Sequence, residues 1–343
     1  MGDIRYNKSI VKNINESLIR RSLQGIGPFT KTKVARETGL SFPTVSRILD
    51  EMAESGEILG GGVDPTTGGR HAQSYVLNPE YAYVLCIYFP REKTMRALLM
   101  NAVGELVERE EVEIENIPTA VRETLDETIR RKMEKYPLKA VSVALPCGVS
   151  QGKLLFGAKG TSLEGYGLEE HLKKTFGIGA RVENDMNTAA TGCYVRMFGR
   201  DERISLACIS VGSVGCGCGL YVRGHLVRGA HGFAGELRYV AADKDVNIDQ
   251  AFREGFTAYD RTVCVAQMVS AVCSTVDPAC VVFYERSDTK TDLPAVEEAC
   301  RRFLPEEVVP HLIMTGAYVD DLEKGLTEFG TELLLSGYEI VNR

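Results

Sequence analysis

The sequence has no apolar run long enough to cross a membrane. Its longest runs fall far short of the roughly 18–20 consecutive apolar residues that a bilayer requires. The N-terminus leads into polar residues and lacks the apolar core of a secretory signal. These two absences predict a cytoplasmic protein with no membrane partner.

The cysteines lack the pattern of a disulfide framework. The chain has ten of them, scattered singly through apolar segments such as those around Cys86 and Cys208. This usage favours buried free thiols in a reducing compartment. Apolar residues make up 44% and charged residues 25% of the 343 residues, which indicates a globular protein of two or three domains.

The chain also lacks a positive net charge, which is −7 and by itself argues against nucleic acid. The charge is unevenly distributed, however. Residues 5–47 hold nine basic and two acidic side chains, so this stretch is +7 and the remainder is −14. The asymmetry predicts a basic binding module on an acidic body, although a solvated basic surface would look the same.

The first eighty residues contain the pattern of a winged helix-turn-helix. Helical periodicity covers residues 7–22, a second short helix is expected over 31–37 after a Thr cap, and Gly39 breaks the chain. Ser41 is then expected to cap a third helix, and the two strands of a β-hairpin wing are expected within residues 58–77. A small helical bundle without a ligand is the alternative interpretation.

In such a motif the second helix of the pair enters the major groove by its N-terminal end. Short hydroxyls and Arg can reach phosphates or base edges there, and an Arg on a Gly-rich wing can enter the minor groove. The predicted DNA contacts are Lys31, Lys33, Ser41, Thr44, Ser46, Arg47 and, on the wing, Arg70.

From about residue 81 the pattern is α/β, with strands, Gly-rich turns and helices in alternation. Helices are expected over residues 119–136, 163–176 and 188–194. The expected domains are 1–80, 81–195 and 196–319, with a C-terminal helix over 320–343 returning to the first α/β lobe. A cleft between the two lobes would hold a small effector.

Several segments of this α/β region resemble the ROK family, which is named for repressors, open reading frames and sugar kinases. Residues 183–187 resemble its E-N-D-x-N motif, 229–236 its R-G-x-x-G-x-x-G-E segment and 145–149 its L-P-G-P-V loop. The wing sequence 68–70 is typical of the regulator branch. The resemblance implies an actin-like, ribonuclease-H-like ATPase fold in two lobes.

The resemblance also implies a sugar site. In family kinases the Asn and Asp of E-N-D-x-N hold the sugar and the Asp is the general base, which corresponds to Asn184 and Asp185 here. The Glu of the G-E segment corresponds to Glu236. Carboxylate and carboxamide groups have the fixed donor and acceptor directions that polyol recognition needs. A turn with a helix cap is the alternative explanation for residues 184 and 185.

The phosphate-binding elements of the family kinases are missing. Their first hairpin carries D-x-G-G-T, whereas the corresponding turn over residues 88–94 has neither Gly nor Asp, and Pro90 lacks an N–H donor. The glycine pair that approaches adenosine is replaced by Phe283 and Tyr284. A Gly-rich loop survives at 212–219, but it cannot support phosphoryl transfer alone. We therefore expect no enzymatic activity and no cofactor.

The zinc site that the resemblance would imply is also missing. Tyr239 stands where the family has a His, and residues 240–262 contain no Cys. Cys216 and Cys218 lack partner ligands at zinc spacing, so we expect no metal. The zinc segment also supplies a sugar-binding Glu in the family. Glu254 is expected to replace it, with Asp249 or Glu236 alone as the alternatives, and Tyr239 would line the altered pocket.

These observations together predict a transcriptional regulator of sugar metabolism that acts as a repressor and binds operator DNA as a homodimer or homotetramer. Its effector would be a sugar or a sugar phosphate. Two alternatives stay open at this point. One is a sugar kinase with an appended DNA-binding domain, and the other is a constitutive DNA-binding protein with a vestigial sugar cleft.

Overall fold

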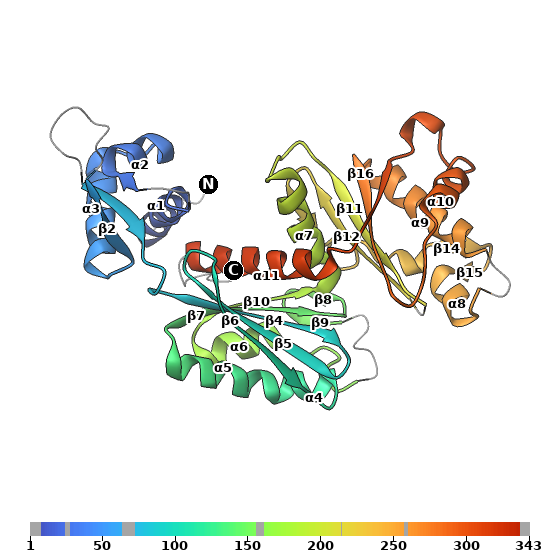
Figure 1. Ribbon diagram of the computed structural model, residues 1–343, viewed down its shortest axis with the longest axis horizontal. Coiled ribbons are helices and arrows are strands. Elements are labelled where there is room, and N and C mark those ends of the chain that lie inside the picture. The colour runs from blue at the N-terminus through green and yellow to red at the C-terminus, as the bar shows by residue number, and fades with distance from the viewer. Residues whose placement is uncertain are drawn as a thin grey trace, which may run out of the picture.

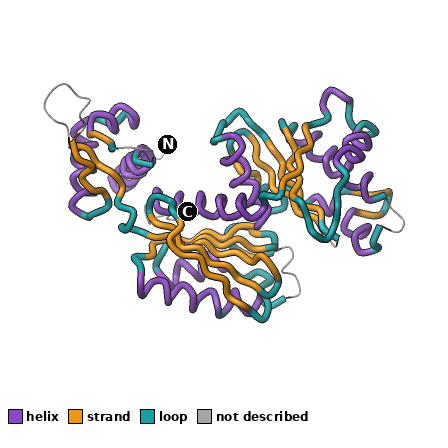
Figure 2. Tube along the Cα trace, in the orientation of Figure 1, coloured by secondary structure: helices purple, strands orange, loops and turns teal. Residues whose placement is uncertain are grey.

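The structure is a computed structural model. Figure 1 shows three parts, an N-terminal unit and two α/β lobes, with a long C-terminal helix that runs between them. Figure 2 shows that each lobe is built on a sheet covered by helices. The structure describes residues 8–24, 28–63, 73–155, 161–213, 215–256 and 260–336.

The N-terminal unit contains three helices and a small sheet of order β1-β3-β2. Its elements are α1 (Lys8–Ser22), β1 (Phe29–Thr30), α2 (Lys31–Thr38), α3 (Phe42–Glu54), β2 (Ile58–Val63) and β3 (Gln73–Leu77). The expected helices and hairpin strands are thereby confirmed. The side chains of Thr30 and Ser41 accept hydrogen bonds from the N–H groups of Lys33 and Thr44, which starts α2 and α3 where the sequence predicts.

The first lobe holds a five-stranded sheet of order β10-β7-β4-β5-β6, in which β4, β7 and β10 are parallel and β4, β5 and β6 antiparallel. Helices α4, α5 and α6 cover one face of it. The elements of this lobe are β4 (Tyr83–Arg91), β5 (Thr94–Asn101), β6 (Leu106–Glu113), α4 (Ile117–Arg122), α5 (Thr124–Lys135), β7 (Leu138–Leu145), β8 (Val149–Ser150), β9 (Lys153–Leu154), α6 (Leu168–Phe176) and β10 (Gly179–Asn184).

The second lobe repeats this topology, because its sheet has the order β13-β12-β11-β16-β17 with the same pattern of antiparallel and parallel neighbours. Helices α8, α9 and α10 pack on its outer face. The elements are β11 (Leu206–Val211), β12 (Cys216–Val222), β13 (His225–Val227), η1 (Leu237–Tyr239), β14 (Ala241–Asp243), β15 (Val246–Asn247), α8 (Ile248–Arg253), α9 (Arg261–Val276), β16 (Cys280–Tyr284), α10 (Leu293–Cys300), η2 (Glu306–Val308) and β17 (His311–Thr315).

Two helices, α7 (Asp185–Phe198) and α11 (Tyr318–Leu335), lie between the two sheets. Residues of β4 alternate between two cores: Leu85 and Ile87 face α5, while Val84 and Cys86 face α7 and α11. The central core also takes in Cys208 and neighbouring side chains of the second sheet. The two lobes therefore share one hydrophobic core around these helices.

Three sequence-based helix boundaries were wrong. The helix expected over 119–136 is broken into α4 and α5, because Glu123 adopts a non-helical conformation with φ −127° and ψ −64°. The helix expected over 163–176 begins only at Leu168, after a turn in which Gly165 has φ +71°. The helix expected over 188–194 is longer and runs from Asp185 to Phe198, because Asn184 caps it and starts it three residues before the expected first residue.

No helix among the described residues combines the length and apolar character needed to cross a membrane. The last residues of the helix expected over 320–343 lie outside the described residues, as does Arg70 on the expected wing. Helix α11 runs from the second lobe along the first sheet toward the N-terminal unit (Figure 1).

Candidate functional site

The E-N-D-x-N segment stands at the end of β10 and the start of α7. The Asn184 carboxamide caps α7, since Oδ1 accepts from the Asn187 N–H at 3.0 Å, and Nδ2 donates to the Cys147 carbonyl at 3.1 Å. Glu183 is buried, and its Oε1 accepts from the Asn187 carboxamide at 3.0 Å. The cap that the sequence offered as an alternative is therefore present, and it holds the loop of Cys147 beside the motif.

Asp185 lies at the first position of α7. Its Oδ1 accepts from the Met186 N–H at 2.8 Å, and its Oδ2 accepts from the Tyr318 hydroxyl at 3.1 Å. The pKa of Asp185 is raised to about 6, because burial and, to a smaller extent, the nearby negative charge of Glu236 outweigh the lowering effect of these hydrogen bonds. The carboxylate keeps lone pairs that can accept from ligand hydroxyls.

Glu236 reaches the same place from the Gly-rich segment 229–236. Burial raises its pKa, and the Arg238 guanidinium, whose Nε lies 3.2 Å from its Oε2, works against this. Gly232 and Gly235 have positive φ of 67° and 87°, and a Cβ on either would overlap a backbone carbonyl, that of Val149 or of Cys218. Only Gly permits this close approach. The segment 229–236 therefore packs against both the 145–149 loop and strand β12.

The structure thus gathers Asn184, Asp185 and Glu236, with Cys147 between them. Burial, together with the negative charges of Asp185 and Glu236, raises the pKa of the Cys147 thiol to about 12. The other two predicted site residues are Tyr239, whose backbone N–H donates to the Glu236 carbonyl at 3.2 Å, and Glu254. Tyr239 is half exposed and its ring packs on Phe233 with centroids 5.1 Å apart. Glu254 is an exposed residue at the end of α8. Helix α8 lies on the side of the second lobe away from α7 (Figure 1).

The turn that would face phosphate is a tight hairpin between β4 and β5, with Arg91 paired to Thr94. The surviving Gly-rich loop is occupied by the chain itself. Asp288 Oδ2 accepts from both the N–H and the hydroxyl of Ser213, at 3.0 and 2.9 Å. The Arg286 guanidinium and these two donors hold the pKa of Asp288 well below its usual range. An internal carboxylate therefore occupies the hydrogen-bond donors of Ser213 in this loop.

Tyr284, one of the residues that replace the glycine pair, is buried at the end of β16. Its hydroxyl bonds to Asp321, with 3.0 Å to Oδ2, and its ring meets that of Tyr318 edge to face with centroids 5.2 Å apart. Asp321 has no exposed surface and is held by Arg196 at 2.6 and 2.9 Å. A phenol and an ion pair thus fill the space beside the start of α11.

A zinc ion does not fit this chain at the position that the family resemblance implies. Tyr239 offers no imidazole, and Cys216 and Cys218 are buried in β12, where burial raises the pKa of the Cys216 thiol to about 12. Among the described residues, no three His, Cys, Asp or Glu side chains are grouped so that they could hold a metal.

Four of the predicted DNA contacts, Ser41, Thr44, Ser46 and Arg47, lie at the start of α3, and Lys31 and Lys33 lie at the start of α2. Ser41 and Thr44 are hydrogen bonded to each other, at 2.8 Å between their hydroxyls, while Arg47 is half exposed and paired to Glu51 at 2.5 Å. Lys31 is bound to Ser46 at 2.9 Å and to Asp50 at 2.6 Å. These partners are all near the surface, where water and DNA phosphates can compete for them.

Lys33 lies over the Phe29 ring, with its Nζ 4.6 Å from the ring centroid. Sequence reasoning missed Phe42, which follows the cap residue and is 52% exposed. A large apolar side chain at the first position of a helix that should enter a groove can contact a thymine methyl group. Its position directly after the predicted cap was the available signal.

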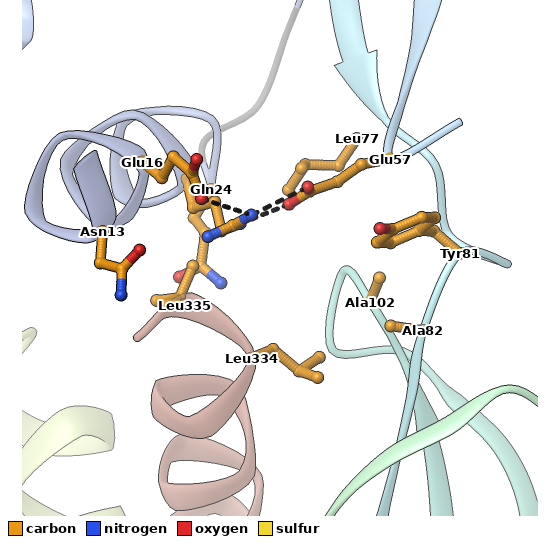
Figure 3. A pocket seen from close by; sticks show the side chains of 11 residues that line it. Asn13, Glu16, Gln24, Glu57, Leu77, Tyr81, Ala82, Ala102, Leu334 and Leu335 are labelled. Carbon is orange, nitrogen blue, oxygen red and sulfur yellow. Dashed lines mark hydrogen bonds and ion pairs between the residues drawn. The ribbon is translucent and has the colours of Figure 1, made fainter. Parts of the chain in front are cut away.

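The N-terminal unit meets the body at a cavity of about 280 Å³ (Figure 3). Its upper wall is polar, because Arg20 on α1 binds Glu57 at 2.5 and 3.1 Å and approaches Glu16 at 3.5 Å. Its floor is apolar, with Leu334 and Leu335 at the end of α11. This contact joins the first helix of the unit to the helix that lies between the lobes.

Comparison with known proteins identifies the class to which this fold and site belong. Residues 84–271 match the ROK family, and the chain belongs to that family. This span holds the E-N-D-x-N segment and the Gly-rich segment that ends at Glu236.

Several curated relatives carry descriptions. The chain is similar to a xylose repressor of Bacillus spizizenii, at 22% identity over 69% of this chain and 62% of the relative. It is also similar to a xylose repressor of Caldicellulosiruptor bescii, at 25% over 67% and 59%. A third is the DNA-binding transcriptional dual regulator NagC of Escherichia coli, at 25% over 69% and 59%. The chain spans about three fifths of the length of these relatives.

Solved structures show the same fold. A ROK family transcriptional regulator, a homologue of the Escherichia coli MLC protein, superposes with a TM-score of 0.72 at 16% identity, over 95% of this chain and 98% of that chain. A ROK family glucokinase from Streptomyces griseus, in complex with glucose and AMPPNP, gives a TM-score of 0.52 at 16% identity, over 72% of this chain and 99% of that chain. Mixed α/β lobes like those of the sugar kinases therefore form the body of the molecule.

Proposed function

We propose that this protein is a DNA-binding transcriptional repressor of sugar metabolism whose α/β lobes bind a sugar, or a sugar phosphate, without phosphorylating it. The relatives described as xylose repressors and as NagC support this proposal. The observation that carries it is the basic N-terminal unit of helices and hairpin, joined to a sugar-kinase-like body whose anion loop is occupied by Asp288.

The N-terminal unit is proposed to be a winged helix-turn-helix domain over residues 1–80. Helices α2 and α3, the turn at Gly39 and the β2–β3 hairpin have the order that this domain requires. The glucokinase covers 72% of this chain, whereas the regulator covers 95%. The regulator therefore matches more of this chain than the glucokinase does, as expected if the N-terminal unit belongs to regulators.

Direct contacts to DNA are proposed for the start of α3 and the face beside it. Arg47 is the residue proposed to read a base, with Phe42 as an apolar neighbour. The remaining contacts position the helix on the phosphates, and the wing supplies Arg70 to the minor groove. The proposed phosphate and base contacts are Lys31, Lys33, Ser41, Thr44 and Ser46.

The sugar is proposed to lie between the lobes against Asn184, Asp185 and Glu236. The two carboxylates and the carboxamide converge there from α7 and from the segment before η1. Tyr239 is proposed to line the pocket beside Glu236, and Glu254 to line it if α8 moves toward α7 when the sugar binds. The lobes are proposed to divide at about residue 195, with α11 returning to the first lobe.

The protein is proposed not to be an enzyme. Phosphoryl transfer depends on a positioned phosphate cradle, and here the hairpin turn lacks Gly while Ser213 is bound to Asp288. A coupled assay for ADP release with MgATP and a panel of hexoses, pentoses and amino sugars should show no turnover above buffer. Turnover that depends on Asp185 would overturn this part of the proposal.

Regulation is proposed to work through the angle between the lobes. Two DNA-binding units of a homodimer or homotetramer must match two operator half-sites about one or more helical turns apart. A sugar that closes the cleft would change the spacing of those units and so the affinity for the operator. This is allostery in the thermodynamic sense, with a coupling free energy between two sites.

Selection of bound fragments from random DNA, followed by titration of the selected operator, tests the proposal. Arg47→Ala should weaken operator binding by about 1–3 kcal/mol and relax specificity at one base pair. The control is Arg203→Ala. Arg203 is an exposed residue that follows α7 and lies outside the N-terminal unit. Failure to select any sequence, or equal losses in both variants, would contradict the DNA-binding assignment.

Calorimetric titration with the same sugar panel tests the cleft. At least one sugar should bind the wild-type chain, and Asp185→Ala should remove that binding. The operator affinity should change when the sugar is present. If no sugar in the panel binds, the body is a scaffold with a vestigial cleft.

A further inference from the structure

A second cavity, which we call the junction cavity, lies where three parts of the chain meet. It has a volume of about 800 Å³ and is lined by Arg21 on α1, Lys173 on α6, Arg181 on β10, Arg228 after β13 and Glu332 on α11. This volume lies within the range of small-molecule sites. The N-terminal unit, both lobes and the helix between them therefore all contribute to one space.

The charged groups around the junction cavity do not balance. Three ion pairs are formed within it: Lys173 with Glu169 at 2.6 Å, Arg181 with Glu332 at 2.8 Å, and Arg228 with Glu183 at 2.6 Å. Arg21 is the fourth cation, and within the described part of the chain it forms no ion pair. The junction cavity thus carries one positive charge in excess.

Hydrogen-bond donors are also left over. Arg228 uses Nε for Glu183, while its Nη2 is buried and has no hydrogen-bond partner among the described residues. Arg181 bonds to Glu332 through Nη1 and stacks on the Phe329 ring at 3.8 Å from the ring centroid. A buried donor without a partner destabilises the folded chain, and an acceptor from a ligand would remove that penalty.

The two guanidinium groups lie close enough to repel each other. Burial lowers the pKa of Arg181 most, and the positive charge of Arg228 is the second largest cause. Two Arg forks in a partly dry cavity are the arrangement that binds phosphoryl oxygens in bidentate fashion. Neutral sugars would not relieve this repulsion, whereas an anion would.

We propose that the junction cavity binds a small molecule through a phosphoryl group, which lies between Arg228 and Arg181 and reaches Arg21 and Lys173. The proposed sugar site is adjacent to this cavity. Glu183, which binds Arg228, stands two residues before Asp185. The cavity extends away from that site to Glu332, which lies 14 residues after Tyr318, the partner of Asp185, or about 21 Å along α11.

A phosphorylated ligand in this cavity would act on DNA binding. It would join Arg21 of the DNA-binding unit to Arg228 of the second lobe, and Glu183, the partner of Arg228, belongs to the same segment as Asn184. Binding would therefore fix the N-terminal unit against the lobes. This second site goes beyond the proposed function, because it adds an anion signal to the sugar signal.

Isothermal titration calorimetry of the full chain with inorganic phosphate and with pyrophosphate tests the site. The ionic strength is kept constant, with chloride as the balancing anion. Neither sugar nor DNA is present, so a negative result here leaves the proposed function untouched. We expect saturable binding of at least one probe with one site per chain. The proposal is overturned if neither probe binds at about 20 mM. This concentration is on the order of the weakest dissociation constant that a metabolite site would need.

Variants locate the binding. Arg21→Gln and Lys173→Gln should each weaken it at least about fivefold, since each removes one cation from the ligand. Lys174→Gln is the matched control, because Lys174 follows Lys173 on α6, is exposed and pairs with Glu170 outside the cavity. Equal affinity in wild type, Arg21→Gln and Lys173→Gln would place the anion elsewhere and overturn the assignment.

Discussion

The hydroxyl of Tyr318 donates a hydrogen bond to Oδ2 of Asp185 at 3.1 Å, and these are the first residues of α11 and α7. The bond joins the starts of the two helices that lie between the sheets. It also uses one oxygen of the carboxylate proposed to bind the sugar. Changes at this carboxylate are therefore expected to reach the contact between the lobes.

Sugar binding should weaken as the pH falls below about 6. Burial raises the pKa of Asp185 to about 6, so the carboxylate that accepts from sugar hydroxyls is protonated below this value. The association constant should fall by at most about tenfold per pH unit. Calorimetry at pH 5.0 and 7.5 measures this, and equal wild-type affinities at the two values would contradict it.

Asp185 should also leave a signature in stability. Its folded pKa lies above its ordinary value of 3.8, so between about pH 4 and 6 the folded state keeps a proton that the unfolded chain has lost. The free energy of unfolding should therefore fall as the pH rises through this window. Asp185→Asn cannot titrate, and urea unfolding of this variant should lack that part of the decline. Parallel pH profiles for the two proteins would exclude the raised pKa.

The local parts of the fold could be predicted from sequence because their causes are local. Thr30 and Ser41 each bind an N–H three residues later, so the starts of α2 and α3 are encoded in short segments. The break at Glu123 has no such signal, since its neighbours favour a helix on both sides. Tertiary packing decided that boundary.

The candidate site was predictable only in part, for the same reason. Asn184 and Asp185 stand in one recognisable segment. The hydrogen bond from Ser213 to Asp288 spans 75 residues and that from Tyr318 to Asp185 spans 133 residues. No local pattern announces either contact. The junction cavity is still less visible in the sequence, because its cations come from four separate segments of the chain.

Removal of Arg20 should destabilise the N-terminal unit. Arg20 and Glu57 are only 17% and 11% exposed, so Arg20→Met leaves a largely buried carboxylate without its partner. We expect a loss of about 3 kcal/mol in the free energy of unfolding of this unit. Urea unfolding measures it, and Arg20→Met/Glu57→Gln should recover part of the loss. Arg21→Met, at the next and exposed position, is the control, and an equally large loss there would contradict the argument.

Asp288→Ala should open the Gly-rich loop to anions. The variant frees the N–H and hydroxyl of Ser213, which the carboxylate of Asp288 now occupies. The test uses the Arg21→Gln/Lys173→Gln background, which removes two proposed phosphoryl contacts of the junction cavity. In that background MgATP should raise the melting temperature when Asp288→Ala is added but not when Asp288 is present, and turnover should stay absent in both because the first hairpin still lacks Gly. Asp245→Ala removes the same charge from an exposed position in the second lobe and is the control. An equal response to MgATP in that background with Asp288 present would refute this interpretation of Asp288.

Gly325→Ala should loosen the packing of α11 on α7. A Cβ at Gly325 would overlap the carbonyl oxygen of Thr188 on α7, and a Cβ at Gly192 would overlap that of Asp321 on α11. Helix propensity alone would make the substitution stabilising by about 1 kcal/mol, so a net loss isolates the contact between the helices. We expect a loss of about 3 kcal/mol, since the backbones must separate.

Urea unfolding provides the measurement, with Lys324→Ala as the control one residue earlier on the exposed face of α11. The control should change the free energy of unfolding by less than about 0.5 kcal/mol. Because α7 carries Asp185 and α11 carries its partner Tyr318, Gly325→Ala should also weaken sugar binding at temperatures where the variant is folded. A stabilised variant would mean that the helices tolerate a wider crossing, and the two glycines would then not fix the arrangement of the lobes.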